Sequence, residues 1–174
     1  MSKAALKKQL NQLTKEQAIE VVLELYEARK EAKEYLEFYL NPNENEKLEE
    51  YKKIICEEFY PTRVTKDSQT RFSVCRKAIS DFKKLKPNPL LLGELMVYYI
   101  ELGCQFTYDY GDMWEQYYDA ICRNFDKTMD FLSKNKLIEE FKPRIKQCLR
   151  WASVCGWGFP DEMNDIYYNY TEEL

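Results

Sequence analysis

Carboxylates and tyrosines alternate in residues 106–120, which read FTYDYGDMWEQYYDA. Carboxylate oxygens at short intervals are the ligands that Ca²⁺ prefers, so the stretch has to be considered as a cation site. An EF-hand loop with Gly111 at its sixth position would need oxygen ligands at positions one, three and five and Glu at position twelve. The residues at those positions are aromatic: Phe106, Tyr108, Tyr110 and Tyr117. The spacing therefore argues against a calcium loop, and we assign no metal ligand.

The same stretch fits a boundary between two helices. Gly111 can adopt the positive φ that ends a helix. Asp112 then follows as the predicted N-cap of the next helix. Glu115, three residues further on, favours the positive end of that helix's dipole.

The tyrosines of this stretch are harder to explain by a helix boundary alone. The chain contains three pairs of adjacent tyrosines, one of them in this stretch: 98/99, 117/118 and 167/168. Adjacent tyrosines on a helix cannot both face one core, so one member of each pair should lie near the surface or line a groove. Tyrosine is favoured at binding surfaces because it offers a large area and a hydroxyl group at low entropic cost. The rings could also serve only to cover helix junctions. We predict an acidic interaction surface that uses Tyr108, Tyr110, Tyr117 and Tyr118.

The chain of 174 residues contains no histidine. This excludes Ser-His-Asp and Cys-His catalysis and zinc hydrolases of the H-E-x-x-H kind. No glycine-rich phosphate loop is present either. We assign no catalytic or cofactor-binding residue and expect a protein that is not an enzyme. One alternative stays open: an enzyme or small-ligand binder with a groove that contains Glu94, Glu101, Asp109 or Tyr108. Glu94 and Glu101 suggest it because they lie seven residues apart on one face of a helix. If a Lys or Arg pairs with them, they are instead ion-paired core residues.

Basic residues are concentrated in residues 61–86, which hold eight basic and two acidic side chains, whereas residues 87–135 hold three basic and eight acidic ones. One hypothesis is a nucleic-acid-associated accessory protein that contacts phosphates through this segment. The alternative is that the basic helix face complements the acidic 87–135 half, in the same chain or across a dimer. The candidate phosphate contacts are Arg63, Lys66, Arg71, Arg76 and Lys77.

Composition favours a helical cytoplasmic protein. Only five Gly and six Pro occur in the chain, while Leu, Lys and Glu are abundant. No signal peptide is apparent at the N-terminus, and no apolar run is long enough to span a bilayer. The six cysteines show no C-x-x-C spacing, so we expect buried, reduced thiols.

Apolar periodicity predicts an all-α fold: a single compact domain over residues 1–174, of about seven to eight antiparallel helices, bundle-like or an irregular α-α solenoid. A capping box at Thr14 begins a helix that we expect to run to residue 39. The helix over about 89–107 is apolar on nearly every side and should be central. Pro143 should kink or divide the helix over 137–155. Trp157 and Phe159 should fold back onto the core after that helix.

Four stretches together resemble a family of small bacterial proteins classed as a domain of unknown function: LNPNENEKLEE, RKAISDFKKL, LGELMVYYIELGCQFTYDYGD and CGWGFPDEMNDIYY. FTYDYGD and GWGF are the most distinctive of them. The resemblance implies a bacterial cytoplasmic protein and supplies no activity. From the residues themselves we expect a protein–protein interaction or scaffold protein, with a protein partner or self-association and no membrane contact.

Overall fold

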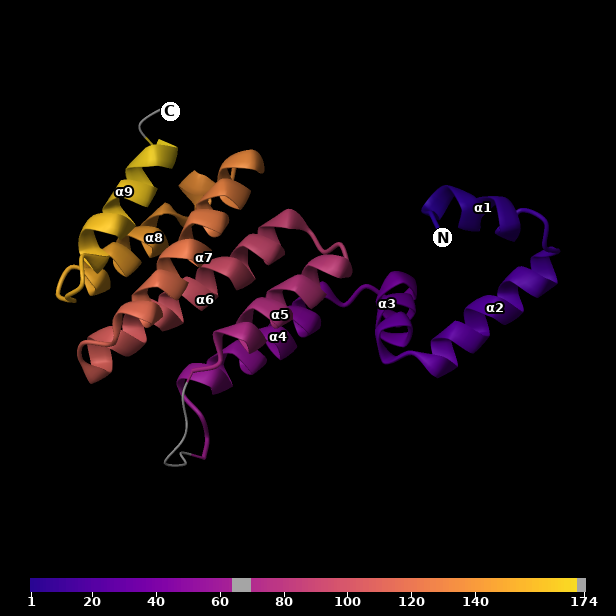
Figure 1. The fold of residues 1–174 in the computed structure, drawn as a ribbon, viewed down its shortest axis with the longest axis horizontal. Coiled ribbons are helices and arrows are strands. Elements are labelled where there is room, and N and C mark those ends of the chain that lie inside the picture. Colours follow the sequence, from indigo (N-terminus) through magenta and orange to yellow (C-terminus); the bar gives the residue numbers. More distant parts are fainter. Residues whose placement is uncertain (64–69, 172–174) are drawn as a thin grey trace. The chain divides into compact units, whose positions relative to one another are not determined.

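The computed structural model describes residues 1–63 and 70–171, and Lys66 therefore lies outside the described residues. Within those ranges the chain forms nine helices and no strand, which confirms the predicted all-α fold (Figure 1). The count is higher than expected because one predicted helix is divided. The helices are α1 (Lys3–Leu10), α2 (Lys15–Ala28), α3 (Lys30–Leu40), α4 (Glu44–Phe59), α5 (Phe72–Lys84), α6 (Pro89–Tyr110), α7 (Glu115–Lys134), α8 (Ile138–Ala152) and α9 (Phe159–Thr171).

The chain separates into two compact units, Met1–Asn43 and Glu44–Leu174. We call them the N-terminal unit and the six-helix unit. That the whole chain acts as one domain stays a prediction.

The N-terminal unit contains the divided helix. Thr14 accepts the N–H of Gln17 at 3.2 Å while the Gln17 side chain accepts the N–H of Thr14 at 2.9 Å, which confirms the capping box. The predicted helix from 14 to 39 is wrong, however, because Arg29 has an extended backbone (φ −136°, ψ 118°). The break lets α3 pack against α2, where the Tyr26 hydroxyl donates to Glu37 at 2.9 Å. Neither Gly nor Pro marks this break in the sequence.

The six-helix unit is built around α6. This helix packs against α4, α5, α7 and α8, and α9 packs against α7 and α8 (Figure 1). Ten residues of α6 are buried, which confirms that this apolar helix is central. Gly103 permits the closest approach, because a Cβ there would lie 2.3 Å from Cδ1 of Ile121 on α7. Apolar surface all round the helix is thus removed from water, which is the main stabilising term of such a core.

Two further expectations concern α8 and the cysteines. α8 is one continuous helix with Pro143 inside it, so the alternative of two shorter helices is wrong, and the alternative of a kink stays a prediction. Pro143 lies in the second turn, where its missing N–H removes only one helical hydrogen bond. All six cysteines are free thiols; four are buried, as predicted, whereas Cys56 and Cys155 are only partly buried.

Candidate functional site

The boundary between α6 and α7 is where the sequence places its candidate surface. α6 ends at Gly111, whose φ is 93°, and the Gly111 N–H donates to the Thr107 carbonyl at 3.0 Å. This confirms Gly111 as the residue that ends the helix. A positive φ of this kind is readily adopted only by glycine, so the turn is defined by this residue.

Asp112 does not cap α7, contrary to the prediction. α7 begins at Glu115 after Trp114, whose side chain makes no capping hydrogen bond. Asp112 instead accepts hydrogen bonds from the Tyr118 hydroxyl and, at 3.1 Å, from the Gly156 N–H in the α8–α9 connection. The Tyr118 hydroxyl and then the Gly156 N–H lower the pKa of Asp112. The carboxylate therefore joins two connections that are 44 residues apart.

The contact with the α8–α9 connection explains its glycine. A Cβ on Gly156 would lie 2.8 Å from an Asp112 carboxylate oxygen, so a larger residue would displace the carboxylate. Trp157 follows with a φ of 58°, an uncommon conformation for a bulky residue. Its side chain is 65% exposed, so the expectation that it folds back onto the core is wrong, whereas Phe159 is buried as expected. The stretches FTYDYGD and GWGF thus meet in space.

Tyr118 is the centre of a buried polar group at this boundary. Its hydroxyl accepts the Met113 N–H at 2.9 Å and lies 2.8 Å from the Thr107 hydroxyl. Its ring stacks on Phe159 with centroids 4.5 Å apart. Burial and then the Asp112 hydrogen bond raise the pKa of Tyr118, so it stays a neutral hydroxyl that can donate.

Tyr117 is buried next to it, and its hydroxyl donates to the Gly103 carbonyl at 2.9 Å. The expectation that one tyrosine of each adjacent pair lies near the surface is thus wrong for this pair. Both hydroxyl groups form hydrogen bonds with α6: that of Tyr117 with a backbone carbonyl and that of Tyr118 with the Thr107 side chain. Tyr117 and Tyr118 support the predicted surface from beneath and are not part of its accessible area.

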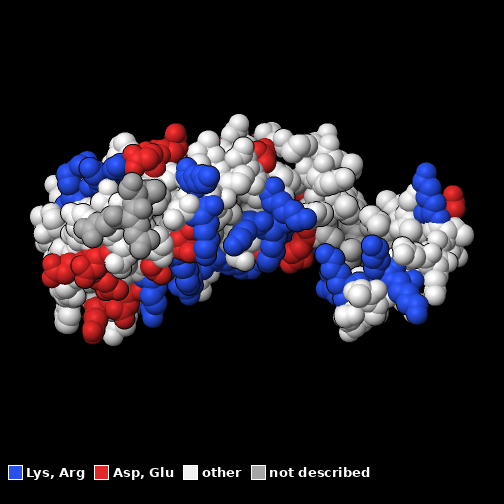
Figure 2. Space-filling model, turned by 90° about the horizontal axis from the view of Figure 1, so that it is seen from above, with Lys and Arg blue, Asp and Glu red and all other residues white. Residues whose placement is uncertain are grey.

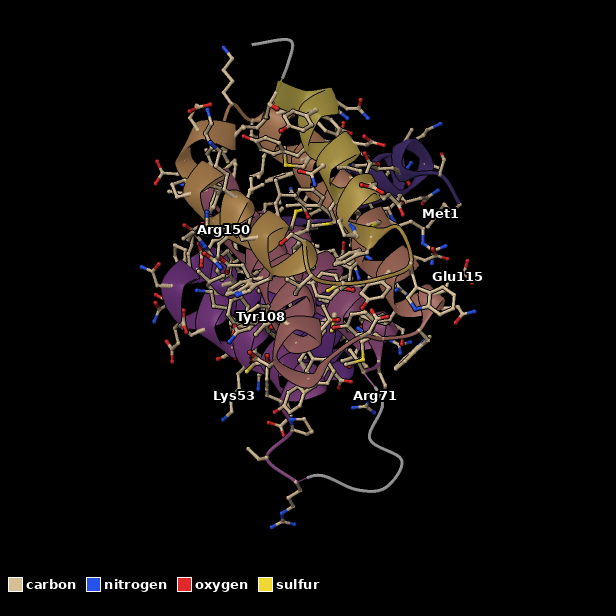
Figure 3. All side chains as sticks on the ribbon, turned by 90° about the vertical axis from the view of Figure 1, so that its left-hand side faces the viewer. Met1, Lys53, Arg71, Tyr108, Glu115 and Arg150 are labelled. Atoms are coloured by element: carbon tan, nitrogen blue, oxygen red, sulfur yellow. The ribbon has the colours of Figure 1, made fainter. Side chains whose placement is uncertain are left out.

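Tyr108 and Tyr110 are exposed, at 54% and 66%, but they do not form one patch. Residues two apart on a helix point about 200° away from each other, so the two rings lie on different sides of α6. Figure 3 labels Tyr108 and Glu115, whose side chains lie apart on the face turned toward the viewer. Residues 106–120 therefore present two separate aromatic positions.

Tyr110 belongs to a continuous group of rings. It packs on Phe106 with centroids 4.9 Å apart, and Phe106 packs on Tyr117 at 6.2 Å. Trp114 packs on Tyr117 at 5.7 Å and is 45% exposed. The exposed rings of Tyr110 and Trp114 thus rest on the half-buried ring of Phe106 and the buried ring of Tyr117, which fix their position.

Tyr60, just after α4, completes this group, although no sequence pattern identified it. Its ring packs on Phe106 at 5.6 Å and on Tyr110 at 6.1 Å, and its hydroxyl donates to Asp109 at 3.0 Å. Burial and then this hydrogen bond raise the pKa of Tyr60. No local pattern could have linked residues 49 positions apart. We define the aromatic–acidic surface as Tyr60, Asp109, Tyr110, Trp114 and Glu115.

The basic segment finds its acidic partners nearby. Arg71 forms a bidentate ion pair with Glu58 of α4, with contacts of 2.9 and 2.6 Å. Asp81 of α5 pairs with Lys77 and, at 2.7 Å, with Lys84. Glu58 and Asp81 lie outside residues 87–135, so these ion pairs do not join the basic helix to the acidic half. Arg63, Arg71, Arg76 and Lys77 are exposed.

Glu94 and Glu101 are ion-paired. Arg144 of α8 donates Nε to Glu101 at 2.6 Å and also contacts Glu94, and Lys52 of α4 lies 2.8 Å from Glu94. Burial raises the pKa of Glu94, but the hydrogen bonds from Lys52 and Arg144 outweigh it, so the net shift is downward. Arg144 is thus the partner that both carboxylates share, and the sequence alone did not identify it.

Neither a metal centre nor a membrane-spanning helix is found in the described part of the chain. Residues 1–63 and 70–171 contain no group of three or more His, Cys, Asp or Glu side chains placed to hold a metal ion. Among the same residues, no helix has both the length and the apolar character that crossing a membrane requires.

Comparison with known proteins relates the chain to a family. A model of a family of unknown function, DUF6155, matches residues 1–171 and confirms the resemblance. No curated protein and no solved structure matches the chain.

The polar group around Tyr118 predicts the effect of removing its hydroxyl. Tyr118→Phe leaves the Thr107 hydroxyl, the Met113 N–H and Asp112 each without one partner, so we expect the free energy of unfolding to fall by about 1–3 kcal/mol in urea titrations. Tyr170→Phe is the matched control, since it loses one exposed hydrogen bond to Asp126, and should cost less. Equal losses in the two variants would contradict this role of Tyr118.

The Arg144 ion pairs predict a pH-dependent effect. Arg144→Met leaves Glu94 and Glu101 without their shared cation, and we expect a loss of about 2 kcal/mol at pH 7. Because the folded-state pKa of Glu94 is lowered, its contribution to stability is present above its unfolded pKa of about 4.3 and is lost as pH falls through the folded value. Urea titrations at pH 7 and at about pH 3.5 should therefore show a smaller difference from the wild type at the lower pH. A difference that grows on acidification would show that the carboxylates are not the stabilised partners.

Proposed function

Since the chain belongs to the family of unknown function DUF6155, which carries no assigned activity, we propose its function from the site. We propose a protein–protein interaction or scaffold role in the bacterial cytoplasm, with the aromatic–acidic surface as the contact. The partner is another protein that presents basic side chains. A second copy of the chain is the self-association form of the same proposal.

One observation supports this proposal above the others: two large exposed aromatic side chains pack on less accessible rings, the half-buried Phe106 and the buried Tyr117. Tyr110 and Trp114 leave 66% and 45% of their area in water although Phe106 and Tyr117 hold them in place. Ordering an exposed side chain on binding normally costs free energy, and rings that are already packed on one side lose less. Tyr and Trp are also the residues most enriched among the energetically dominant residues of interfaces.

The charge around these rings favours a basic partner. Asp109 and Glu115 flank Tyr110 and Trp114, and residues 106–120 contain no Lys or Arg. Lys or Arg of a partner can contact the carboxylates and lie over the faces of the rings.

A second proposal is association with nucleic acid through the basic segment. It is favoured by the exposure of Arg63 and Arg76 in the basic segment of the six-helix unit. Against it stand the ion pairs of Arg71 and Lys77, which already neutralise part of this charge.

The two proposals differ in affinity recovery from lysate of the source cells. We expect wild-type protein to recover a partner after nuclease treatment and Tyr110→Ala/Trp114→Ala to lose most of it, because truncating two such anchors typically costs more than about 2 kcal/mol. Tyr168→Ala is the matched control. Tyr168 is 50% exposed, and it lies at the end of α9 opposite Phe159, near the Tyr170–Asp126 contact.

Recovery that disappears with nuclease would instead support the nucleic-acid proposal, and Arg63→Glu/Arg76→Glu should then abolish it. Recovery that is equal in the double variant and in Tyr168→Ala would refute a role for the aromatic–acidic surface.

A further inference from the structure

The α2 helix exposes apolar side chains that the N-terminal unit does not cover. Ile19, Val22 and Leu23 follow helical spacing, and each leaves 45% or more of its area in water. No residue of α2 is buried, although the structure describes all of residues 1–43. A helix of this kind normally buries such a face against another element.

The α1 helix carries a smaller face of matching character. Leu6 and Leu10 recur at i and i+4 within α1, Leu13 follows in the connection after the helix, and all three are exposed. α1 is about 12 Å long and α2 about 21 Å long at 1.5 Å per residue, so the leucine face of one could lie entirely along the other.

The two helices have opposite charges. α1 contains Lys3, Lys7 and Lys8 and no acid. α2 contains only Lys15 against four acids that fall on one side of the helix at spacings of three and four: Glu16, Glu20, Glu24 and Glu27. Figure 2 shows basic side chains gathered on the face of the N-terminal unit that the view presents. The N-terminal unit thus carries two apolar faces, one on α1 flanked by Lys and one on α2 flanked by Glu.

We propose that the N-terminal unit carries a self-association surface. α1 of one chain packs along α2 of a second copy, and α1 of the second copy packs along α2 of the first. A two-fold axis makes such contacts reciprocal, so each copy contributes one basic and one acidic helix. The apolar residues supply the association free energy, and the Lys–Glu contacts set which helices meet.

Charge complementarity is the reason for choosing a second copy as the occupant. Residues 1–43 hold seven basic and seven acidic side chains, so two N-terminal units meet without net repulsion. The whole chain has a net charge of −4, all of which therefore lies in residues 44–174. The self-association surface shares no residue with the aromatic–acidic surface, and the inference does not rest on the proposed function.

A charge-exchange experiment on the full chain tests the arrangement. Lys3→Glu/Lys7→Glu places acids on both helices, and Glu16→Lys/Glu20→Lys places bases on both helices. Sedimentation equilibrium at concentrations on the order of 1 to 100 µM should show a dimer for the wild type and at least about tenfold weaker association for each variant alone. An equimolar mixture of the two variants should recover the dimer, because α1 of each variant then meets an α2 of opposite charge in the other.

Two further variants test the apolar part of the interface. Val22→Glu should weaken the dimer by at least about tenfold, because it removes a buried apolar contact at the interface. Since Val22 is exposed in the single chain, the circular dichroism spectrum and thermal unfolding of this variant should match the wild type under dissociating conditions. Tyr110→Ala should leave the dimer intact.

Three results would overturn the proposal. A wild-type chain that stays monomeric throughout the concentration range has no such interface. Charge variants that dimerise like the wild type would show that these helices do not meet. Variants that stay monomeric when mixed would show that α1 closes onto α2 of its own chain, since a contact within one chain cannot be restored by a second chain.

Discussion

The guanidinium of Arg144 contacts the carboxylates of both Glu94 and Glu101, and these ion pairs let the central helix α6 carry two acids. A helix that is covered on nearly all sides can carry two partly buried carboxylates only at high cost unless cations accompany them. Arg144 comes from α8 and Lys52 from α4, so the same ion pairs fix two neighbouring helices against α6. The acids that suggested a reaction site are better explained as a structural element.

At the other end of α6, hydroxyl groups and the Asp112 carboxylate also need partners. Thr107, Tyr118 and Asp112 supply these partners to one another and to backbone groups of both connections. This arrangement holds the α8–α9 connection against the α6–α7 boundary. Beside it, Phe106 and Tyr117 form the base on which Tyr110 and Trp114 pack. The aromatic–acidic surface is therefore a consequence of how α6 ends.

Sequence patterns predicted the structure best where the cause is local. Helical periodicity, the capping box at Thr14 and the positive φ of Gly111 depend on neighbours a few positions away, and the structure confirms all three. They failed where a distant contact decides the outcome. Asp112 has the sequence context of an N-cap, but its carboxylate instead accepts hydrogen bonds from the Gly156 N–H and the Tyr118 hydroxyl. Tyr117 and Tyr118 cannot be recognised as buried until α6 is placed, and the division at Arg29 has no local signal.

If another protein covers Tyr110 and Trp114, as we propose, the contact should be detectable inside the cell. A photo-activatable crosslinking amino acid is placed at position 110, and in a second chain at position 168, and the source cells are irradiated. We expect a discrete crosslinked protein species from position 110 that is absent from position 168. No crosslinked species at position 110, or the same species at both positions, would contradict the proposal.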